Sequence, residues 1–454
     1  MRFCKESMSQ TATHRQSQDN FPEWPRSVFR GVSSFQALAM FRRGLFYAYL
    51  SVYLRYHLGL SVTETTLFAT LPMLLNILSQ TFIWGRISDR RQIRRTLILW
   101  GELSGGIGLL FVWVAHVWVD SPAMAGYVII IGLSFVEILW SMSNIGWSAL
   151  ISDLYPQRDR SAVMGLLTSF GGVGRLGGIW IGGLLYDGLG RMYDGWGFAS
   201  GTLFFVSIGV MLISMIPVYY LPEGGIRGSQ AVEESCDAQC LRTSIRLYAV
   251  FLAAMVFVNF GRNCVMVIQS QYLFLESGFG VSSRVLSYIF NMESLAIILF
   301  GLLAGKICQV LGNGRTVCIG AAAALLYLVL FVLAADLWMI YLASFFRGAA
   351  EVIILASSYA LASILIPPQR RGRLFGYFNA TLFLSWGVAG TLIAGPVVDL
   401  MQFAGFPEVT AYKGAYVAAL AMTSVGMGIL VFLVFVLLPR AGVGEDAGVP
   451  EKRR

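Results

Sequence analysis

The stretch of sequence that decides the fold runs Gly85-Arg86-Ile87-Ser88-Asp89-Arg90-Arg91 and continues through Gln92-Ile93-Arg94-Arg95. It lies between two apolar blocks, 64–86 and 96–118, each close to the ~20 residues that a helix needs to cross a hydrocarbon core of about 30 Å. Charged residues confined to a short connection between two such blocks indicate two membrane-spanning helices joined by a loop.

The composition of the whole chain supports this interpretation. Hydrophobic residues make up 56% of the 454 residues and charged residues only 13%. A soluble domain carries about 25% charged residues. These values exclude a disordered protein, a disulfide-rich secreted module and an ordinary cytosolic enzyme. Basic loops at a lipid bilayer explain the net charge of +8, so no nucleic-acid partner is expected.

Twelve apolar blocks follow a polar N-terminal segment that lacks the apolar region of a cleavable signal peptide. They predict an all-α integral membrane protein with twelve transmembrane helices. The predicted spans are 35–57, 64–86, 96–118, 124–152, 162–186, 198–221, 247–272, 286–308, 316–335, 338–366, 374–398 and 414–438. The predicted organisation is a cytoplasmic tail 1–34, a six-helix half 35–221, a cytoplasmic linker 222–246, a second six-helix half 247–438 and a cytoplasmic tail 439–454.

The basic residues set the orientation. With both termini in the cytoplasm, only Arg55, Arg191, Arg284 and Lys413 of the 33 Lys and Arg residues fall in outer loops. Five more lie within spans, and the rest lie in cytoplasmic segments. Because cytoplasmic loops collect Lys and Arg, the sequence predicts that the N- and C-termini are both inside.

The two halves repeat one another. A shift of 219 residues superimposes the first span on the seventh, placing Phe41, Arg43 and Tyr53 on Phe260, Arg262 and Tyr272. At a shift near 212, the run 156–158 falls on 368–370, and Asp187 falls on Asp399. Two six-span halves repeated in parallel are typical of many secondary transporters.

With these features the chain resembles the major facilitator superfamily. The stretch from Gly85 to Arg95 is similar to the family's loop motif G-x-x-x-D-[RK]-x-G-[RK]-[RK], although Gln92 replaces the second glycine and the final basic pair sits one residue late. The resemblance implies a secondary transporter that works by alternating access. It also implies a cytoplasmic latch, in which the glycine permits close helix approach and the acid meets a helix N-terminus or an arginine. The predicted latch residues are Gly85, Asp89, Arg90, Arg94 and Arg95.

Ionisable residues inside the spans are the candidate functional residues, because a charge at the bilayer centre costs several kcal/mol. In the resembled family, spans 1, 4, 7 and 10 line the central cavity. The expected substrate-binding residues are Arg43, Arg262 and Arg347, which suit an anionic metabolite or metal chelate, and the candidate proton-coupling residues are Glu137, Glu293 and Glu351. Two alternatives remain open: the arginines can pair with nearby glutamates, and Arg347 can pair with Glu351 four residues later on the same helix face. Arg42 is expected to reach the cytoplasmic interface, Glu102 to serve as a latch or packing residue, and Arg175 is left without a role.

The sequence contains no motif that indicates a catalytic, nucleotide-binding or metal site. It lacks a P-loop, a catalytic triad and a nucleotide motif, so no enzyme activity is expected. Cys236 and Cys240 form the only close pair of cysteines, and the three histidines are dispersed away from them. Free thiols are therefore expected rather than a metal site, and no cofactor is expected. The expected partners are a small-molecule or ion substrate and the lipid bilayer, and the expected state is a monomer. A receptor or assembly protein on the same scaffold is the alternative from another functional class.

A narrower resemblance concerns the runs 41–47 and 58–64. These look like the magnetosome-associated members of the superfamily, the MamH type. That resemblance implies iron import, for which an anionic iron chelate suits Arg43 and Arg262 better than a bare ion does. A bare ion would need carboxylates as ligands. The expected location is a bacterial inner membrane, or the magnetosome membrane if the narrower resemblance holds.

Overall fold

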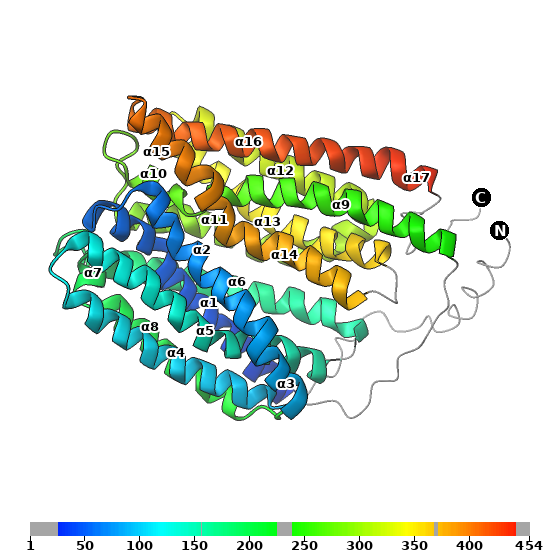
Figure 1. Ribbon diagram of the computed structural model, residues 1–454, viewed down its shortest axis with the longest axis horizontal. Helices are drawn as coiled ribbons and strands as arrows, with labels where there is room; N and C mark the ends of the chain where they lie inside the picture. Colours follow the sequence, from blue (N-terminus) through cyan, green and yellow to red (C-terminus); the bar gives the residue numbers. More distant parts are fainter. Residues whose placement is uncertain (1–25, 156, 225–237, 367–370, 442–454) are drawn as a thin grey trace.

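The structure is a computed structural model that describes residues 26–155, 157–224, 238–366 and 371–441. Within these ranges all regular elements are helices, and they run side by side along the long axis of the molecule (Figure 1). Large apolar side chains such as Phe111, Trp118 and Phe403 are more than 60% exposed on the outside of the bundle. In water this would be unfavourable, but a lipid surface accommodates it.

The N-terminal half contains the first six spans. Its elements are α1 (Arg26–Val52) with the π-helical turn η2 (Tyr53–His57), α2 (Val62–Ser79) with η3 (Gln80–Trp84) and α3 (Gly85–Arg91), α4 (Arg94–Val117), α5 (Pro122–Leu154), α6 (Gln157–Tyr186), and α7 (Trp196–Ala199) followed by α8 (Thr202–Tyr219). Helix α1 includes residues before the predicted first span, which starts at residue 35.

The C-terminal half repeats this order. Its elements are α9 (Ala238–Cys264) followed by α10 (Ile268–Phe274), α11 (Ser283–Leu311), α12 (Asn313–Leu333), α13 (Leu337–Leu365), α14 (Arg371–Ala389) with η5 (Gly390–Ala394) and α15 (Gly395–Phe403), and α16 (Glu408–Phe432) with η6 (Leu433–Leu437) and α17 (Leu438–Arg440). Residues 238–246, which the sequence assigns to the linker, belong to helix α9.

Twelve helical spans are therefore present in the described residues. Ten of them are long and apolar enough to cross a membrane by length and composition. The other two are α1, with 27 residues, and α6, with 30 residues. Both are long enough, but Arg42 and Arg43 interrupt the apolar run of α1, and Arg175 interrupts that of α6. The predicted all-helical architecture in two six-helix halves is confirmed.

The halves pack against one another mainly through α6 with α11 and through α2 with α14 and α15. Small residues allow this close packing: a Cβ at Gly172 would lie 2.7 Å from Ile298, and one at Gly387 would lie 2.8 Å from Met73. In Figure 1 the two halves diverge toward the end that carries α3 and α17. With the predicted orientation, this is the cytoplasmic end.

The opposite, outer end is closed by hydrogen bonds between the halves. The hydroxyls of Ser51 and Ser270 lie 2.6 Å apart, and Gln271 donates to the Thr65 hydroxyl at 2.7 Å. Further along α2, the Thr70 hydroxyl donates to the carbonyl of Gly387 at 2.7 Å. Among the described residues, the hydrogen bonds and ion pairs that join the halves lie in the outer or central part of the bundle. The structure is thus closed on the outer side.

Two carboxylates complete this outer closure in matching positions. Asp399 accepts from the backbone N–H groups of Val62 at 3.1 Å and Thr63 at 2.8 Å, at the start of α2. Asp187 accepts from the Ser283 hydroxyl at 2.9 Å, at the start of α11. Each carboxylate reaches the first turn of a helix in the other half, where the unpaired N–H groups and the helix dipole favour negative charge.

Candidate functional site

Arg43 is the cation best placed to meet a solute. It lies in the middle part of α1, yet its side chain is exposed. Within the described part of the chain it makes no hydrogen bond or ion pair. Its guanidinium carbon lies 4.9 Å from the centroid of the Trp140 ring, which gives a cation–π contact. An accessible, unpaired guanidinium at this depth can bind an anion.

Arg42 differs from the prediction that it would reach the cytoplasmic interface. It is buried, with 7% of its surface exposed, and its guanidinium carbon lies 3.9 Å from the Trp140 ring centroid. One of its terminal nitrogens, Nη2, has no hydrogen-bond partner. The aromatic face, rather than water at the interface, stabilises this charge because the side chain turns into the N-terminal half.

Two carboxylates in the N-terminal half balance these arginines. Glu137 on α5 is half-buried and accepts a hydrogen bond from the Asn76 amide on α2. Glu102 on α4 is buried and accepts from Trp140 Nε1 and from the Ser143 hydroxyl, both at 2.7 Å. Glu102 therefore orients the indole that both arginines contact. Within the described residues, the side-chain hydrogen bond of Glu137 comes from a neutral amide.

The C-terminal half forms a different arrangement. Arg262 on α9 is 3% exposed, donates to Glu351 Oε2 at 2.8 Å and donates to Asn259 Oδ1 at 3.2 Å. Glu351 on α13 keeps 27% of its side chain exposed. The pair between Arg347 and Glu351 within α13, which the sequence left open as an alternative, is not formed, and both residues instead pair with other helices. Their rotation in the bundle aims Glu351 at α9.

Arg347 contributes to a triad of charges that crosses between the halves, in which Arg347 and Glu293 are buried and Arg175 is partly exposed. Its Nη1 lies 3.6 Å from Glu293 Oε2 on α11 and also donates to the amide oxygen of Gln269. The other oxygen of Glu293 accepts from Arg175 Nη2, on α6 of the N-terminal half, at 2.9 Å. Glu293 is 4% exposed, so its charge is held between two guanidinium groups. Sequence reasoning found all three charges but gave Arg175 no role.

The predicted latch residues contact their own half in this state. Arg94 pairs with Asp153 at 3.2 Å at the end of α5, and Arg95 pairs with Glu223 at 3.1 Å after α8. Arg90 is exposed. The Asp89 side chain lies outside the described residues.

Gly85, the glycine of the same motif, is required by the backbone of its own helix. Gly85 follows the π-helical turn η3, and a Cβ at this position would lie 2.5 Å from the carbonyl oxygen of Gln80 in that turn. The close approach is thus to its own helix rather than to a neighbouring one.

The sequence predicts only part of the role of the two carboxylates at the outer end, Asp187 and Asp399. Asp187 and Asp399 appear there as one matched pair of the internal repeat. Their partners at the starts of α2 and α11 depend on how the halves meet, and no local pattern specifies that. The signal that could have identified them is the acid at the outer end of the fifth and eleventh spans.

Known proteins share this architecture. A family model described as Major Facilitator Superfamily matches residues 32–261 and residues 251–454. Among curated protein sequences, none matches the chain at a significant level. The solved structures that resemble it include a bacterial homologue of the human lysosomal transporter Spinster in an inward-facing, unoccupied conformation. That structure has 17% sequence identity and a TM-score of 0.63, covering 93% of this chain and 98% of its own.

Two further solved structures that resemble the chain are transporters of other solutes. The nucleoside transporter NupG has 14% identity and a TM-score of 0.66, covering 88% of this chain and 98% of its own. A bacterial metal transporter has 12% identity and a TM-score of 0.59, covering 89% of this chain and 98% of its own. At these identities the likeness concerns the fold. The two matches of the family model run from residue 32 to residue 454, and the chain therefore belongs to the Major Facilitator Superfamily.

Proposed function

We propose that this protein is a secondary active transporter that moves a small anionic solute by alternating access and couples this movement to protons. The observation that carries the proposal is Arg43, an exposed cation without an ion-pair partner among the described residues, on the first span. It lies on the cytoplasmic side of the contact between Ser51 and Ser270 that closes the outer end. A solute entering from the cytoplasmic side can therefore reach it while the outer side is shut.

We infer an anionic solute because the guanidinium of Arg43 has no carboxylate partner among the described residues. A guanidinium in a protein interior favours carboxylate and phosphate groups, which it can bind through two parallel hydrogen bonds. Trp140 supplies an aromatic face beside it, while Glu102 fixes that face through the indole N–H. We assign Arg43 to direct substrate binding and Trp140 to the wall of the same site.

Glu137 is the best candidate for the coupled proton. Its carboxylate lies within electrostatic range of Arg43, and its hydrogen-bond donor is the neutral amide of Asn76. When Glu137 is charged it partly neutralises the arginine. When Glu137 is protonated, Arg43 becomes an uncompensated cation and attracts the anion more strongly. Proton and anion binding would thus favour one another, which is the requirement for symport.

The candidates in the C-terminal half take a secondary role in this proposal. Arg262 and Arg347 are engaged with Glu351 and Glu293, so each needs its carboxylate to be displaced or protonated before it can bind a solute. Glu351 is the more accessible of the two carboxylates. We therefore propose that the pair of Arg262 and Glu351 joins the site when the cytoplasmic side closes.

Metal cargo is less well supported by the residues. Among the described residues, no three His, Cys, Asp or Glu side chains converge in a way that could hold a metal ion. An anionic iron chelate would remain compatible with Arg43. A free divalent ion would need several carboxylates as ligands, and of those inside the spans Glu293 and Glu351 already pair with arginines. Magnetosome-type iron transport is therefore retained only in its chelate form.

The purified full-length protein in proteoliposomes tests the proposal. Under an imposed pH gradient, substrate-induced current and internal pH would be recorded for separate pools of organic anions, iron chelates, free divalent metals, sugars and lipophilic cations. We expect a response to an anionic pool that disappears when the gradient is removed. A response restricted to a neutral or cationic pool would contradict the proposed substrate class. Silence across all pools from folded protein would favour a receptor or assembly role.

A further inference from the structure

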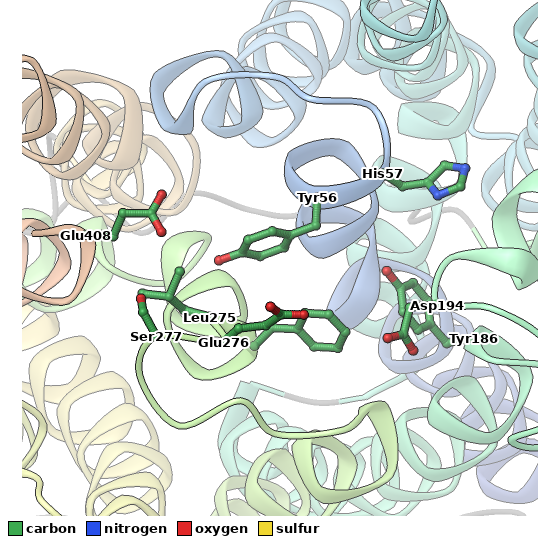
Figure 2. Close-up of a pocket in the computed structure, with 9 residues that line it drawn as sticks. Tyr56, His57, Tyr186, Asp194, Leu275, Glu276, Ser277 and Glu408 are labelled. Carbon is green, nitrogen blue, oxygen red and sulfur yellow. The ribbon is translucent and has the colours of Figure 1, made fainter.

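A cavity of about 510 Å³ lies on the outer face, above the closed contact between the halves. Tyr56, His57 and Asp194 line it from the N-terminal half, and Glu276 and Glu408 line it from the C-terminal half. Figure 2 shows the Tyr56 ring in the middle of the cavity, with Asp194 on one side of it and Glu408 on the other. The volume is within the roughly 300–1,000 Å³ of small-molecule sites.

Aromatic rings form much of the wall. The ring centroids of Tyr56 and Phe274 lie 5.7 Å apart, and those of Tyr186 and Phe274 lie 6.3 Å apart. These three rings come from the first, fifth and seventh spans, so the cluster belongs to both halves. The negative face of an aromatic ring attracts a cation, and quaternary ammonium ions are recognised in this way.

The charges that line the cavity are mainly negative. Three carboxylates contribute to the lining, and only Glu408 has an ion-pair partner among the described residues, Arg55 at 3.6 Å. Partial burial and the neighbouring Asp187 raise the pKa of Asp194 above its usual value. A cation in the cavity would relieve this repulsion.

The form of the site favours an organic cation over a metal ion. No metal-binding group of three His, Cys, Asp or Glu side chains exists among the described residues, so the carboxylates do not converge on one point. They are instead spread around a cavity that is much larger than a single ion. A cation with an apolar body would fill the volume, contact the rings and place its charge between separated carboxylates.

We propose that this outer cavity binds an organic ammonium ion and that the bound ion, by contacting both halves, holds the outer side closed. Binding itself is independent of the transported solute, and only its inhibitory effect on transport rests on the proposed function. A ligand that fits only the closed arrangement shifts the population toward it by a factor of 1 + [L]/Kd.

The binding test uses the full-length protein with Ser277→Cys, a substitution at the exposed cavity wall, in a background whose six native cysteines are replaced by serine. An impermeant maleimide added outside labels this position. Tetraethylammonium at ten times its Kd should slow labelling by about elevenfold. Sodium chloride at the same ionic strength should have little effect. Equal protection by sodium chloride or magnesium chloride, or no protection at all, would overturn the proposal.

Matched variants assign the effect to the cavity. Glu276→Gln should weaken protection by tetraethylammonium, whereas Asp120→Asn, which removes an exposed acid from another outer loop, should leave it unchanged. Unchanged protection in Glu276→Gln would contradict the site.

A second measurement tests the closure. Spin labels at Asp120→Cys and Asp336→Cys, one on the outer face of each half, should shift toward their shorter distance when tetraethylammonium is added. Protection at Ser277→Cys without this shift would contradict the claim that the ligand holds the halves together. Both measurements are independent of any transported solute, so they distinguish failure of this site from failure of the proposed function.

Discussion

The hydroxyl oxygens of Ser51 and Ser270 lie 2.6 Å apart, and the two residues are separated by 219 positions, the shift that superimposes the first span on the seventh. Equivalent residues of a two-fold repeat touch one another only near the symmetry axis. The axis that relates the halves therefore passes through this contact. Arg43 and Arg262 each precede it by eight residues, within α1 for Arg43 and across the break between α9 and α10 for Arg262. From equivalent positions, one of these arginines is exposed and the other is buried in an ion pair.

The outer closure should depend on Asp399. Asp399→Asn removes the negative charge that contacts the first turn of α2 across the interface. A charge at a helix N-terminus contributes about 1 kcal/mol, so we expect the outer-closed population to fall about fivefold relative to the open one. Spin labels at Asp120→Cys and Asp336→Cys should report longer distances. The control Glu276→Gln, without added ammonium, should not change them. An unchanged distance distribution in Asp399→Asn would contradict the role of this carboxylate.

Arg262 should be needed for stability because its buried guanidinium pairs with Glu351. Arg262→Ala leaves Glu351 without its cation, and because Glu351 is partly exposed we expect a cost below the ~3–5 kcal/mol of a fully buried pair. We expect a lower thermal unfolding midpoint and less folded protein. The double variant Arg262→Ala/Glu351→Gln should recover part of this loss, because no unpaired charge remains. If Arg262→Ala were as stable as the wild type, a structural role for Arg262 would be contradicted and direct substrate binding would be favoured.

Glu293 should hold the two halves together at the centre of the membrane. Glu293→Gln leaves Arg175 and Arg347 facing one another without the carboxylate between them. We expect a loss of stability of about 3–5 kcal/mol, larger than for any single exposed charge. Thermal unfolding measures this loss of stability. It is compared for Glu293→Gln and for the triple neutral variant Arg175→Gln/Glu293→Gln/Arg347→Gln. The triple variant should be more stable than Glu293→Gln, and the reverse order would argue against the triad.

Glu137 should be needed for coupling anion uptake to protons and not for the stability of the fold. Glu137→Gln keeps the oxygen that accepts from Asn76 and imitates the protonated acid. We expect uptake of the anion to continue but to lose its dependence on the pH gradient. Glu102→Gln is the matched control, because that carboxylate is held by Trp140 and Ser143 and should leave the gradient dependence in place. Retained gradient dependence in Glu137→Gln would remove Glu137 from the coupling mechanism.

The architecture could be predicted because it depends on long stretches of sequence. Twelve apolar blocks, a basic loop and a repeat at a nearly constant shift each involve many residues, so errors at single positions do not matter. The span boundaries could not be predicted as well: α1 includes residues 26–34 and α9 includes residues 238–246, because helices continue beyond the apolar segment into the polar interface.

The charge pairs could be located but not matched. The spacing of Arg347 and Glu351 predicts a contact within one helix, yet Arg347 pairs with Glu293 and Glu351 pairs with Arg262. In spans that are apolar all round, no periodicity shows which face turns inward, and so the rotation of each helix is hidden. Glu293 and Arg175 are 118 residues apart and meet only because α6 and α11 cross.

The most direct test of the account compares uptake by the wild type with uptake by Arg43→Gln. The anion identified in the proteoliposome screen would be used at one concentration under the same pH gradient. Hydrogen bonds to a charged group contribute about 1.5–3 kcal/mol, so we expect uptake to fall at least about tenfold while the unfolding midpoint changes little. Arg30→Gln, an exposed arginine at the cytoplasmic end of the same helix, is the control and should transport normally. Uptake by folded Arg43→Gln at the wild-type rate would contradict the central claim.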